Sequence, residues 1–489
     1  MLLALLLIPT LAAIVAYGVT NDAVRRLMLV TAVAAHASVV AATWATPPAS
    51  LFGGWLRLDA LGRLFLSITA ALSLPAAVYS VGYLQRESRG VRRDFEEGLW
   101  FANAPEATFT SCLLLFLAAM TLVTISHRFG LLWVAIESTT LASAPLIYFH
   151  RHHRSLEATW KYLLICSVGI ALALLGNFFL AVAASNHGGA PIPLVVRDLT
   201  ERAAELHLPW LRAAFILLLV GYGTKMGLAP LHTWLPDAHS EAPSLVSALL
   251  SGALLNCAFL GVLRAQQVLV AAGQGAFGQD LLVSFGILSM AVAAVFVVGQ
   301  ADYKRMLAYS SVEHMGVLAV GVGVGGAATF GALLHAVNHS LTKAMLFLVA
   351  GNILATYRTK SALEVRGVLR VLPASGALWV AGFLAITGSP PFGPFLSEFT
   401  ILKGALAQGR VVVAGLYLAL LAVVFVGMAT VVLRMVHGAP SAPTEDTPDR
   451  EPLLAIVPPA IIAVIVLVLG VYIPGLLRDA VAAAAGALG

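Results

Sequence analysis

Three ionisable residues recur at four-residue steps inside one apolar segment. His335, His339 and Lys343 occupy positions i, i+4 and i+8 of ALLHAVNHSLTKAMLFLVAG, so a helix places them on one face at intervals of about 6 Å. Histidine is the side chain that changes charge most readily near neutral pH. The stripe predicts a proton relay, with satisfied core histidines as the alternative. Metal binding is disfavoured, because no carboxylate or cysteine nearby completes a ligand set.

Two charges of opposite sign lie within other apolar segments. Glu137 is near the middle of LLWVAIESTTLASAPLIYF, and Lys225 comes just before the run GLAPLHTWLP, where a helix break frees carbonyls that can accept its protons. A charge at the centre of a membrane span costs about 2.5–3.5 kcal/mol, so such residues are rare and usually functional. We expect Glu137 and Lys225 to form a proton switch. An inert glutamate bonded to the following Ser and Thr, or a static ion pair, are the alternatives.

A second acid follows another interrupted segment, ITGSPPFGPFLSEF. We expect Glu398 in this segment to be the terminal site that exchanges protons with the outer face, and a helix cap after Pro394 is its alternative, because first-turn acids favour helix N-termini. Weaker candidates share the neighbourhood of these residues, and their part in a pathway is left open: Glu313, His314, His232, Asp237, His239 and Glu241. The last four also fit a water-exposed loop.

The elements that position these residues are membrane-spanning helices. Apolar residues make up 60% of the 489 residues, charged residues 11%, and the mean hydropathy is +0.91, whereas soluble domains are about 45–50% apolar. Spans of about 20 apolar residues predict an all-α polytopic membrane protein of about 14 transmembrane helices. The expected spans cover 1–19, 26–45, 59–83, 108–127, 129–149, 159–184, 211–235, 244–264, 279–299, 305–325, 328–355, 371–406, 411–436 and 453–477.

The formal charge of +5 is explained by membrane topology and not by nucleic-acid binding. Alternate connections are rich in Lys and Arg, which the positive-inside rule places in the cytoplasm: Arg25, Arg26, Arg86, Arg89, Arg92, Arg93, Arg151, Arg154, Lys304, Arg305, Arg358, Lys360, Arg366, Arg370, Arg434 and Arg450. The run HRHHR at 150–154 is interpreted as a cytoplasmic anchor. We therefore predict a multi-pass protein of the bacterial inner (plasma) membrane with both termini outside, and a first segment, 1–17, that is retained as a helix.

Two of the expected spans carry helix-breaking residues. The seventh contains Gly227 and Pro230, and the twelfth contains Gly388, Pro390 and Pro391. Broken backbone at membrane depth is tolerated where it is buried in protein or lines a cavity, and paired interruptions mark the path in repeat-built transporters. Each break falls in the fourth helix of a block of five, which predicts two inverted five-helix repeats. The expected divisions are 1–107, an N-terminal three-helix segment; 108–272 and 278–437, the two repeats; and 438–489, a cytoplasmic loop and final helix.

The cysteines offer no redox or metal chemistry. Cys112, Cys166 and Cys257 stand alone in apolar runs without C-x-x-C spacing, so no metal and no cofactor are expected. A quinone or flavin enzyme is disfavoured, since no G-x-G-x-x-G follows a strand.

Three strings carry a family resemblance: KMGLAPLHTWLPDAHSEAPSLVSALLSG, ADYKRMLAYSSVEHMG and NHSLTKAMLFLVAG. They resemble the antiporter-like membrane subunits of respiratory complex I, Mrp-type cation/proton antiporters and membrane-bound hydrogenases, over about residues 105 to 436. The resemblance implies that Glu137 and Lys225 are the switch pair. It also implies that His335, His339 and Lys343 are the relay, and that Glu398 is the terminal acid.

Two details refine the resemblance. SSVEHMG, with Glu313, looks most like component F of hydrogenase-4 and related formate hydrogenlyase modules. Many family members have a lysine in the eighth span, where this chain offers Asn256, so water with His335 or His339 is expected to bridge the gap.

The expected function is proton translocation, with Na⁺ as the alternative ion, in a membrane subunit of a redox-driven complex. The resemblance implies as partners other membrane subunits and a peripheral redox module of the nickel–iron hydrogenase type, surrounded by membrane lipid and without nucleic acid. A subunit of complex I proper or of an Mrp-type antiporter is one alternative function. A non-transporting membrane anchor is another.

Overall fold

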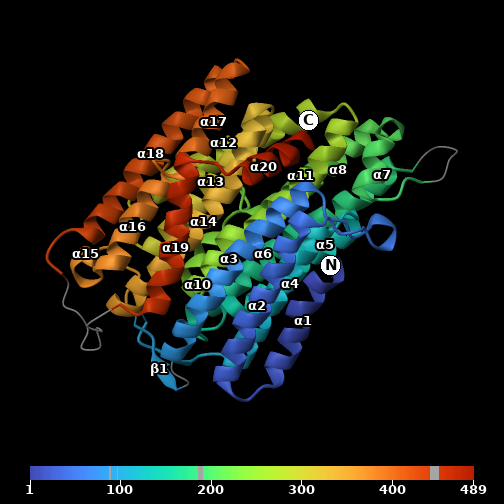
Figure 1. The fold of residues 1–489 in the computed structure, drawn as a ribbon. Coiled ribbons are helices and arrows are strands. Elements are labelled where there is room, and N and C mark those ends of the chain that lie inside the picture. Colours follow the sequence, from blue (N-terminus) through green and yellow to red (C-terminus); the bar gives the residue numbers. More distant parts are fainter. Residues whose placement is uncertain (88–89, 96, 186–190, 441–450) are drawn as a thin grey trace.

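The structure is a computed structural model that describes residues 1–87, 90–95, 97–185, 191–440 and 451–489. These residues are nearly all helical (Figure 1). Arg89 and Arg450, which were used to predict the topology, and residues 441–450 of the predicted cytoplasmic loop lie outside the described residues.

Within the described ranges, 11 helices are long and apolar enough to cross a membrane, and two apolar helices are shorter. The helices of the membrane body are α1 Leu2–Gly18, α2 Asp22–Ala45, α3 Ala60–Arg86, α4 Glu106–Ile125, α5 Phe129–Ile147, α6 His153–Ala183, α8 Leu208–Met226, α9 Trp234–Glu241, α10 Ser244–Leu249, α11 Leu255–Ala271, α12 Gly275–Val297, α13 Tyr303–Val324, α14 Ala327–Tyr357, α16 Pro373–Ile386, α17 Gly393–Ala407, α18 Val411–Val436 and α19 Leu453–Val471. Each expected span contains at least one of them, which confirms the predicted polytopic helical fold.

Smaller elements lie at the ends of the bundle. They are the helices α7 Val196–Glu201, α15 Val368–Val371 and α20 Gly475–Gly486, the short 3-10 helices η1 Phe52–Gly54 and η2 Ala203–Glu205, and the antiparallel strands β1 Val91–Arg93 and β2 Trp100–Ala102. Figure 1 shows β1 at one end of the bundle and α7 and α20 towards the other. The sequence analysis predicted none of these elements.

Polar side chains set the starts of several helices. The Asn21 side chain accepts hydrogen bonds from the backbone N–H groups of residues 23 and 24 at the start of α2. The Asp302 side chain does the same for residues 304 and 305 at the start of α13. Each cap satisfies amide groups that have no partner inside the helix, so short polar residues fix where the apolar segments begin.

Both predicted helix breaks are present. The helix α8 ends at Met226, Gly227 follows with a φ of +87°, and the chain is not helical again until Trp234. In the twelfth span, α16 ends at Ile386 and α17 begins at Gly393. Proline and glycine explain both interruptions, since proline lacks the backbone donor and glycine adopts the positive φ.

Two further differences concern the fourteenth and eighth predicted spans. The fourteenth span was predicted to end at 477, but α19 ends at Val471 and Pro474 precedes a separate helix, α20, which packs against α3 and α14. In the eighth span, a π-helical turn, η3 Leu250–Leu254, interrupts the α-helix between α10 and α11. Hydropathy could not detect this turn, because the mean hydropathy of the segment stays high across it.

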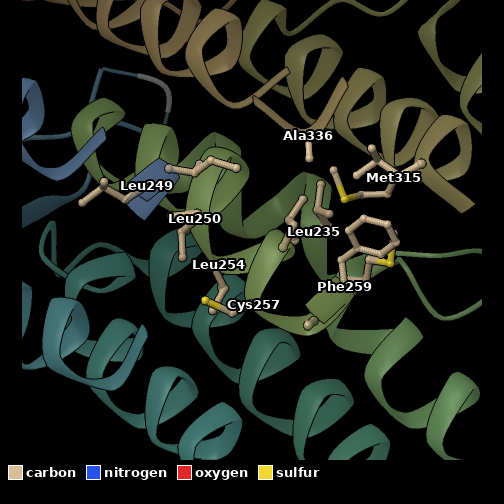
Figure 2. Packing of buried hydrophobic residues seen from close by; sticks show 14 of the residues in the cluster. Leu235, Leu249, Leu250, Leu254, Cys257, Phe259, Met315 and Ala336 are labelled. Atoms are coloured by element: carbon tan, nitrogen blue, oxygen red, sulfur yellow. The ribbon is translucent and has the colours of Figure 1, made fainter. Parts of the chain in front are cut away.

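The most deeply buried packing lies where α9, α10, α11, α13 and α14 meet. Figure 2 shows Leu235, Phe259, Met315 and Ala336 converging from α9, α11, α13 and α14, and each is completely buried. Within residues 244–271 and 303–324, the most apolar stretches of 18 residues are fully buried. Polar residues in these stretches therefore contact other helices.

Glycine lets α6 and α8 approach closely. A Cβ atom on Gly221 would lie 2.6 Å from the backbone oxygen of Gly169 and 2.6 Å from the backbone nitrogen of Ala173. Gly221→Val is therefore expected to separate the two helices and to lower the free energy of unfolding by about 1–3 kcal/mol. Thermal unfolding of the purified protein measures this effect.

The matched control for this substitution is Gly415→Val on α18. Gly415 has no neighbour within 4 Å of an added Cβ and is exposed on the surface of the chain. This variant should unfold at the wild-type temperature. Equal melting temperatures for the two valine variants would contradict the close-packing argument.

Candidate functional site

Glu137 on α5 and Lys225 on α8 are joined through a hydroxyl group. The Lys225 Nζ donates to Thr140 Oγ1 at 2.6 Å and to the Tyr162 hydroxyl at 2.7 Å. The Thr140 hydroxyl donates in turn to Glu137 Oε2 at 3.1 Å. Lys225 is fully buried, whereas Glu137 is partly exposed. The structure thus brings the predicted pair together, with Thr140 between the two charges.

The partners of Lys225 differ from the prediction. We expected carbonyls freed by the Gly227 break to accept its protons, but those carbonyls have other donors. The Trp234 Nε1–H donates to Thr224 O at 2.8 Å, and the Leu228 N–H donates to Gly223 O at 2.8 Å. The ammonium group is therefore held by side-chain hydroxyls of α5 and α6.

A cluster of three histidines lies between α13 and α14. We call it the histidine cluster: His314, His335 and His339. His314 Nδ1 and His335 Nε2 share a hydrogen bond of 3.0 Å, and the ring centroids of His314 and His339 are 5.1 Å apart. The three side chains are at most 1% exposed. The predicted stripe on α14 therefore meets a third histidine that belongs to α13.

Glu398 from α17 closes one side of the histidine cluster. Its Oε1 atom lies 3.9 Å from His314 Nδ1. A Cβ atom on Gly388 would lie 2.0 Å from Glu398 Oε2. The backbone of the break at Gly388 therefore lies directly against the carboxyl group. Glu398 is the sixth residue of α17, and the cap residue is Phe392, without a side-chain cap bond. The alternative of a capping glutamate is therefore wrong.

The same geometry corrects the expectation that no carboxylate lies near the histidines. Metal-ligand atoms of His314, His335 and Glu398 lie within 4.8 Å of one another. The sequence could not show this, because the three residues belong to three different helices.

Lys343 and Glu313 extend the cluster further along α14 and α13. The Lys343 Nζ donates to Leu307 O at 2.6 Å and to Ser310 Oγ, so it faces α13, as the stripe predicts. Glu313 Oε2 lies 4.0 Å from His314 Nε2 and interacts electrostatically with Lys343. Glu313 and His314, whose role the sequence left open, are thus part of the buried constellation.

His239 lies between the two groups of charges. It is fully buried on α9, with its ring centroid 6.1 Å from Trp234, and Trp234 lies 5.0 Å from Tyr162. Tyr162 is bonded to Lys225. On its other side, the His239 ring centroid lies 5.7 Å from that of Phe347, which is one turn after Lys343 on α14. The alternative of a water-exposed loop for this segment is wrong, because α9 is almost wholly buried.

The other candidates lie at the margin of this constellation. Asn256, which stands in place of a family lysine, donates to Ser340 Oγ at 2.7 Å, so it joins α11 to α14 without carrying charge. His232 is 7% exposed, with its ring 6.4 Å from that of Tyr309. Neither contacts the histidine cluster among the described contacts.

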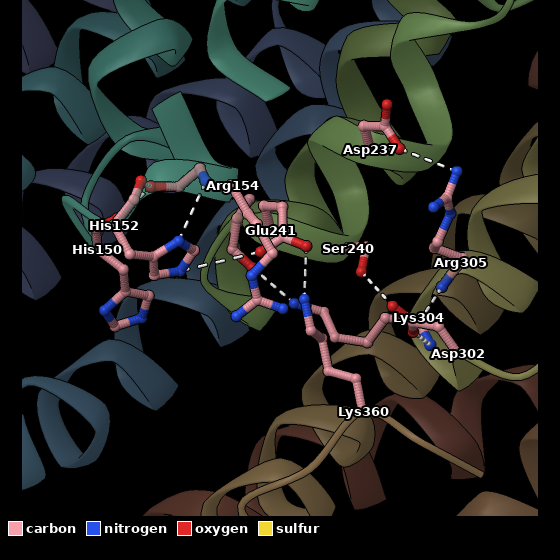
Figure 3. A network of polar contacts seen from close by, with 12 residues as sticks. His150, His152, Arg154, Asp237, Ser240, Glu241, Asp302, Lys304, Arg305 and Lys360 are labelled. Atoms are coloured by element: carbon pink, nitrogen blue, oxygen red, sulfur yellow. Dashed lines mark hydrogen bonds and ion pairs between the residues drawn. The ribbon is translucent and has the colours of Figure 1, made fainter. Parts of the chain in front are cut away.

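A network of ion pairs surrounds the C-terminal end of α9 (Figure 3). Lys360 Nζ and Glu241 Oε1 are 2.5 Å apart, and His152 Nε2 lies 3.9 Å from Glu241 Oε2. Asp237 pairs with Arg305 at 3.0 Å. Burial raises the pKa of Glu241, but the Lys360 ammonium outweighs burial and holds that pKa below the usual carboxyl range. The network links α9, in the first half of the chain, to Arg305 and Lys360 in the second half.

Glu241→Gln is expected to destabilise the protein by about 1.5–3 kcal/mol at neutral pH, because it removes a charged hydrogen-bond partner of Lys360. The folded pKa of Glu241 is lowered, so this stabilisation is complete above the ordinary carboxyl pKa and is lost as the pH falls through the lowered value. Thermal unfolding across the acid range should therefore show a shallower pH dependence in the variant.

The control for this prediction is Glu157→Gln. Glu157 pairs with Lys161 on the surface, where its side chain is 53% exposed, and exposed pairs contribute less than about 1 kcal/mol. A variant of Glu241 that unfolds like the Glu157 variant at every pH would refute the assigned contribution of the network.

Comparison with known proteins gives one family match. Residues 126–425 match the family model described as "NADH:quinone oxidoreductase/Mrp antiporter, TM". Hydrogenase-4 component F homolog of Methylacidiphilum infernorum is 36% identical over 431 residues, which cover 88% of this chain and 87% of that protein. Other curated relatives are longer, and the chain spans 53% of Na(+)/H(+) antiporter subunit A1 of Staphylococcus aureus, to which it is 28% identical over 87% of its own length.

Two solved structures extend the comparison to the whole chain. A chain of the archaeal membrane-bound sulfane sulfur reductase superimposes with a TM-score of 0.86 at 20% identity and covers 100% of this chain and 98% of its own. A chain of respiratory complex I from Thermus thermophilus gives a TM-score of 0.78 at 25% identity, covering 99% of this chain and 100% of its own. The fold is therefore that of membrane subunits in multi-subunit complexes.

Proposed function

This chain belongs to the NADH:quinone oxidoreductase/Mrp antiporter transmembrane family, and on that premise we propose that it is the proton-translocating membrane subunit of a redox-driven complex. The observation that carries the proposal is the row of ionisable side chains inside a multi-pass membrane protein. Ionisable residues in spans mark ion paths and proton relays, and relatives named as hydrogenase and antiporter subunits support the same function.

The path has two parts and a bridge. The first part is the switch of Glu137 and Lys225, joined by Thr140. We assign the bridge to Lys343 to His239, whose ring centroid lies 6.1 Å from that of Trp234 and 5.7 Å from that of Phe347 on α14. From there the proton crosses the histidine cluster to Glu398, which lies against the break in the twelfth span. Pro390 and Pro391 in this break are exposed on the surface of the chain, and we assign the outward release of protons to this point.

The side chains along the path favour H⁺ over Na⁺. A hard cation requires several oxygen ligands, whereas imidazole nitrogen suits protons and borderline transition metals. The path contains two ammonium groups, Lys225 and Lys343, which repel a cation but can themselves lose and regain a proton. Histidine and lysine can thus carry H⁺ in a place where Na⁺ would find few ligands.

The redox chemistry belongs to partner subunits. The relative named for hydrogenase-4 component F supports a membrane-bound hydrogenase or formate hydrogenlyase, with a peripheral nickel–iron hydrogenase as the redox module. The complex I chain at 25% identity and the Na(+)/H(+) antiporter relative support the second candidate, a subunit of complex I proper or of an Mrp-type antiporter.

The proposed placement in the membrane follows from the loops that are rich in Lys and Arg. We assign the bacterial inner membrane with both termini outside, and the divisions 1–107, 108–272, 278–437 and 438–489. Two features support an inverted repeat of the middle divisions: each has a broken fourth span, and α6 packs on α8 as α14 packs on α16 and α17. Reporter fusions at residues 1 and 489 test the orientation.

The function is tested with the intact complex in proteoliposomes. Electron transfer should acidify or alkalise the lumen, the signal should disappear with a protonophore, and it should persist without Na⁺. Mass spectrometry of the purified complex identifies the redox module. A signal that requires Na⁺ would reverse the ion assignment, and a complex that transfers electrons without moving any ion would support the membrane-anchor alternative.

A further inference from the structure

We propose that the histidine cluster and Glu398 form a binding site for a borderline divalent transition metal, of which Zn²⁺ is the physiological representative, and that the bound ion arrests proton transfer. Metal binding stands on geometry alone. The arrest of transport rests on the proposed function.

The ligand atoms are already close to a metal-binding arrangement. His314 Nδ1 lies 3.0 Å from His335 Nε2 and 3.9 Å from Glu398 Oε1, and ligand atoms of all three residues lie within 4.8 Å of one another. In tetrahedral zinc sites the metal–ligand distances are about 2.0–2.2 Å, so neighbouring ligands are about 3.3 Å apart. Small side-chain rotations suffice to bring the three atoms around one ion.

Several buried atoms of this cluster have no hydrogen-bond partner among the described residues. They are Glu398 Oε1, His314 Nε2, and both ring nitrogens of His339. Buried polar atoms are normally bonded, so the cluster holds acceptors that a cation can satisfy. His339, whose ring centroid is 5.1 Å from that of His314, is the nearest protein group for the fourth position, with water as the other choice.

The nature of the ligands selects the metal. Two imidazole nitrogens and one carboxylate suit Zn²⁺, Co²⁺ and similar ions, whereas Na⁺, Mg²⁺ and Ca²⁺ require more oxygen ligands. Lys343, which lies one turn after His339 on α14, contributes a repulsive positive charge. The two acids, Glu313 at 4.0 Å from His314 Nε2 and Glu398, oppose that charge, so the site is not wholly cationic.

Metal binding would remove a step of the proton path. The hydrogen bond between His314 and His335 uses the two nitrogen atoms that face the ion. On binding, the proton of that bond moves to the other nitrogen of the ring that carries it, His314 Nε2 or His335 Nδ1. His314 Nδ1 and His335 Nε2 then each give a lone pair to the metal. The shared hydrogen bond disappears, and a proton can no longer pass between the two rings.

Access to the site runs past the break in the twelfth span. Glu398 lies against Gly388, and the following Pro390 and Pro391 are exposed on the surface of the chain. The break next to Glu398 therefore reaches the surface of the chain, and we assign the entry of the ion to this point. Because every ligand is buried, we expect slow binding and slow release.

The test measures cobalt binding to the purified, chelator-treated complex. Co²⁺ in a tetrahedral nitrogen and oxygen site has a visible absorption band. We expect this band in the wild type. The Co²⁺ affinity should fall by about tenfold or more in His335→Asn and in Glu398→Gln. Glu398→Gln keeps the shape of the side chain, so it serves if His335→Asn does not assemble.

The matched control is His36→Asn on α2. His36 is also fully buried and bonded to a hydroxyl, that of Thr121, but it lies outside the cluster, so the band should persist. An identical band in the wild type, His335→Asn and Glu398→Gln would overturn the proposal, since the metal would then bind elsewhere, for example at the histidines of 150–153.

The transport readout separates the two proposals. Zn²⁺ should inhibit proton translocation by the wild type, and the chelator should restore it. Wild-type proteoliposomes that show the cobalt band but never translocate protons would refute the proposed function and leave the metal site standing. Full proton translocation with Zn²⁺ bound would refute the arrest.

Discussion

Replacing Lys225 by methionine is expected to reduce proton translocation by about 10²-fold or more, while the complex assembles normally. Methionine fills a similar volume but cannot accept or release a proton, and positioned acid–base groups contribute about 10²–10⁴-fold to proton transfer rates. Glu137→Gln should reduce proton translocation to the same extent, because Thr140 links Glu137 to Lys225. Fluorescence of a pH probe in proteoliposomes measures the rate, and size-exclusion chromatography measures assembly.

The matched control is Lys403→Met on α17. Lys403 is exposed on the surface of the chain and lies outside the path, so proton translocation should remain at the wild-type rate. Undiminished translocation in both Lys225→Met and Glu137→Gln would remove these residues from the mechanism. It would also favour the membrane-anchor alternative, which predicts that the buried charges can be neutralised without functional loss.

Asp59→Asn is expected to destabilise the chain by about 3 kcal/mol, the lower end of the loss for breaking a buried ion pair, because Arg264 is fully buried but the Asp59 side chain is 20% exposed. Arg264 on α11 is fully buried and makes two hydrogen bonds to Asp59, at 2.5 and 2.7 Å. Asp59 also caps α3 by accepting a bond from the Gly62 N–H. Asparagine caps a helix about as well as aspartate, so the substitution removes the charge and one of the two oxygen acceptors of Arg264 while the cap is kept. Thermal unfolding of the purified complex measures the loss.

Two further variants distinguish charge from packing in this prediction. Asp280→Asn breaks the pair of Asp280 with Arg410, in which the Asp280 side chain is 72% exposed, and should change stability by less than about 1 kcal/mol. The double variant Asp59→Asn with Arg264→Met should recover part of the loss, because it no longer buries an uncompensated cation. A double variant no more stable than Asp59→Asn would show that the charge is not the cause.

The sequence predicted those features that one helix carries by itself. Apolar length predicted the spans, and glycine and proline predicted the breaks next to Lys225 and Glu398. The four-residue spacing of His335, His339 and Lys343 predicted a common face, and that face does meet α13. Each of these predictions depends on composition or period within one segment, where local rules apply.

The features that the sequence did not reveal depend on how helices are rotated against one another. His314 and Glu398 are far apart in the chain, and only the packing of α13, α14 and α17 brings them to 3.9 Å. Thr140 was recognised as a neighbour of Glu137 but not as its link to Lys225. The amphipathic helix α20 was also missed, because its apolar run is too short for a span.

The π-helical turn at Leu250–Leu254 has an evolutionary consequence. Before the turn, α10 packs on α3 and α14; after it, α11 packs on α8 and α12. One extra residue in a helical turn rotates everything beyond it by about 100°. A single insertion or deletion at this point would therefore change the direction in which the Asn256 and Arg264 side chains point, without altering α10. Sequences of related subunits should vary in length by one residue here more readily than elsewhere in the span, and their buried polar residue can face a different neighbour in each lineage.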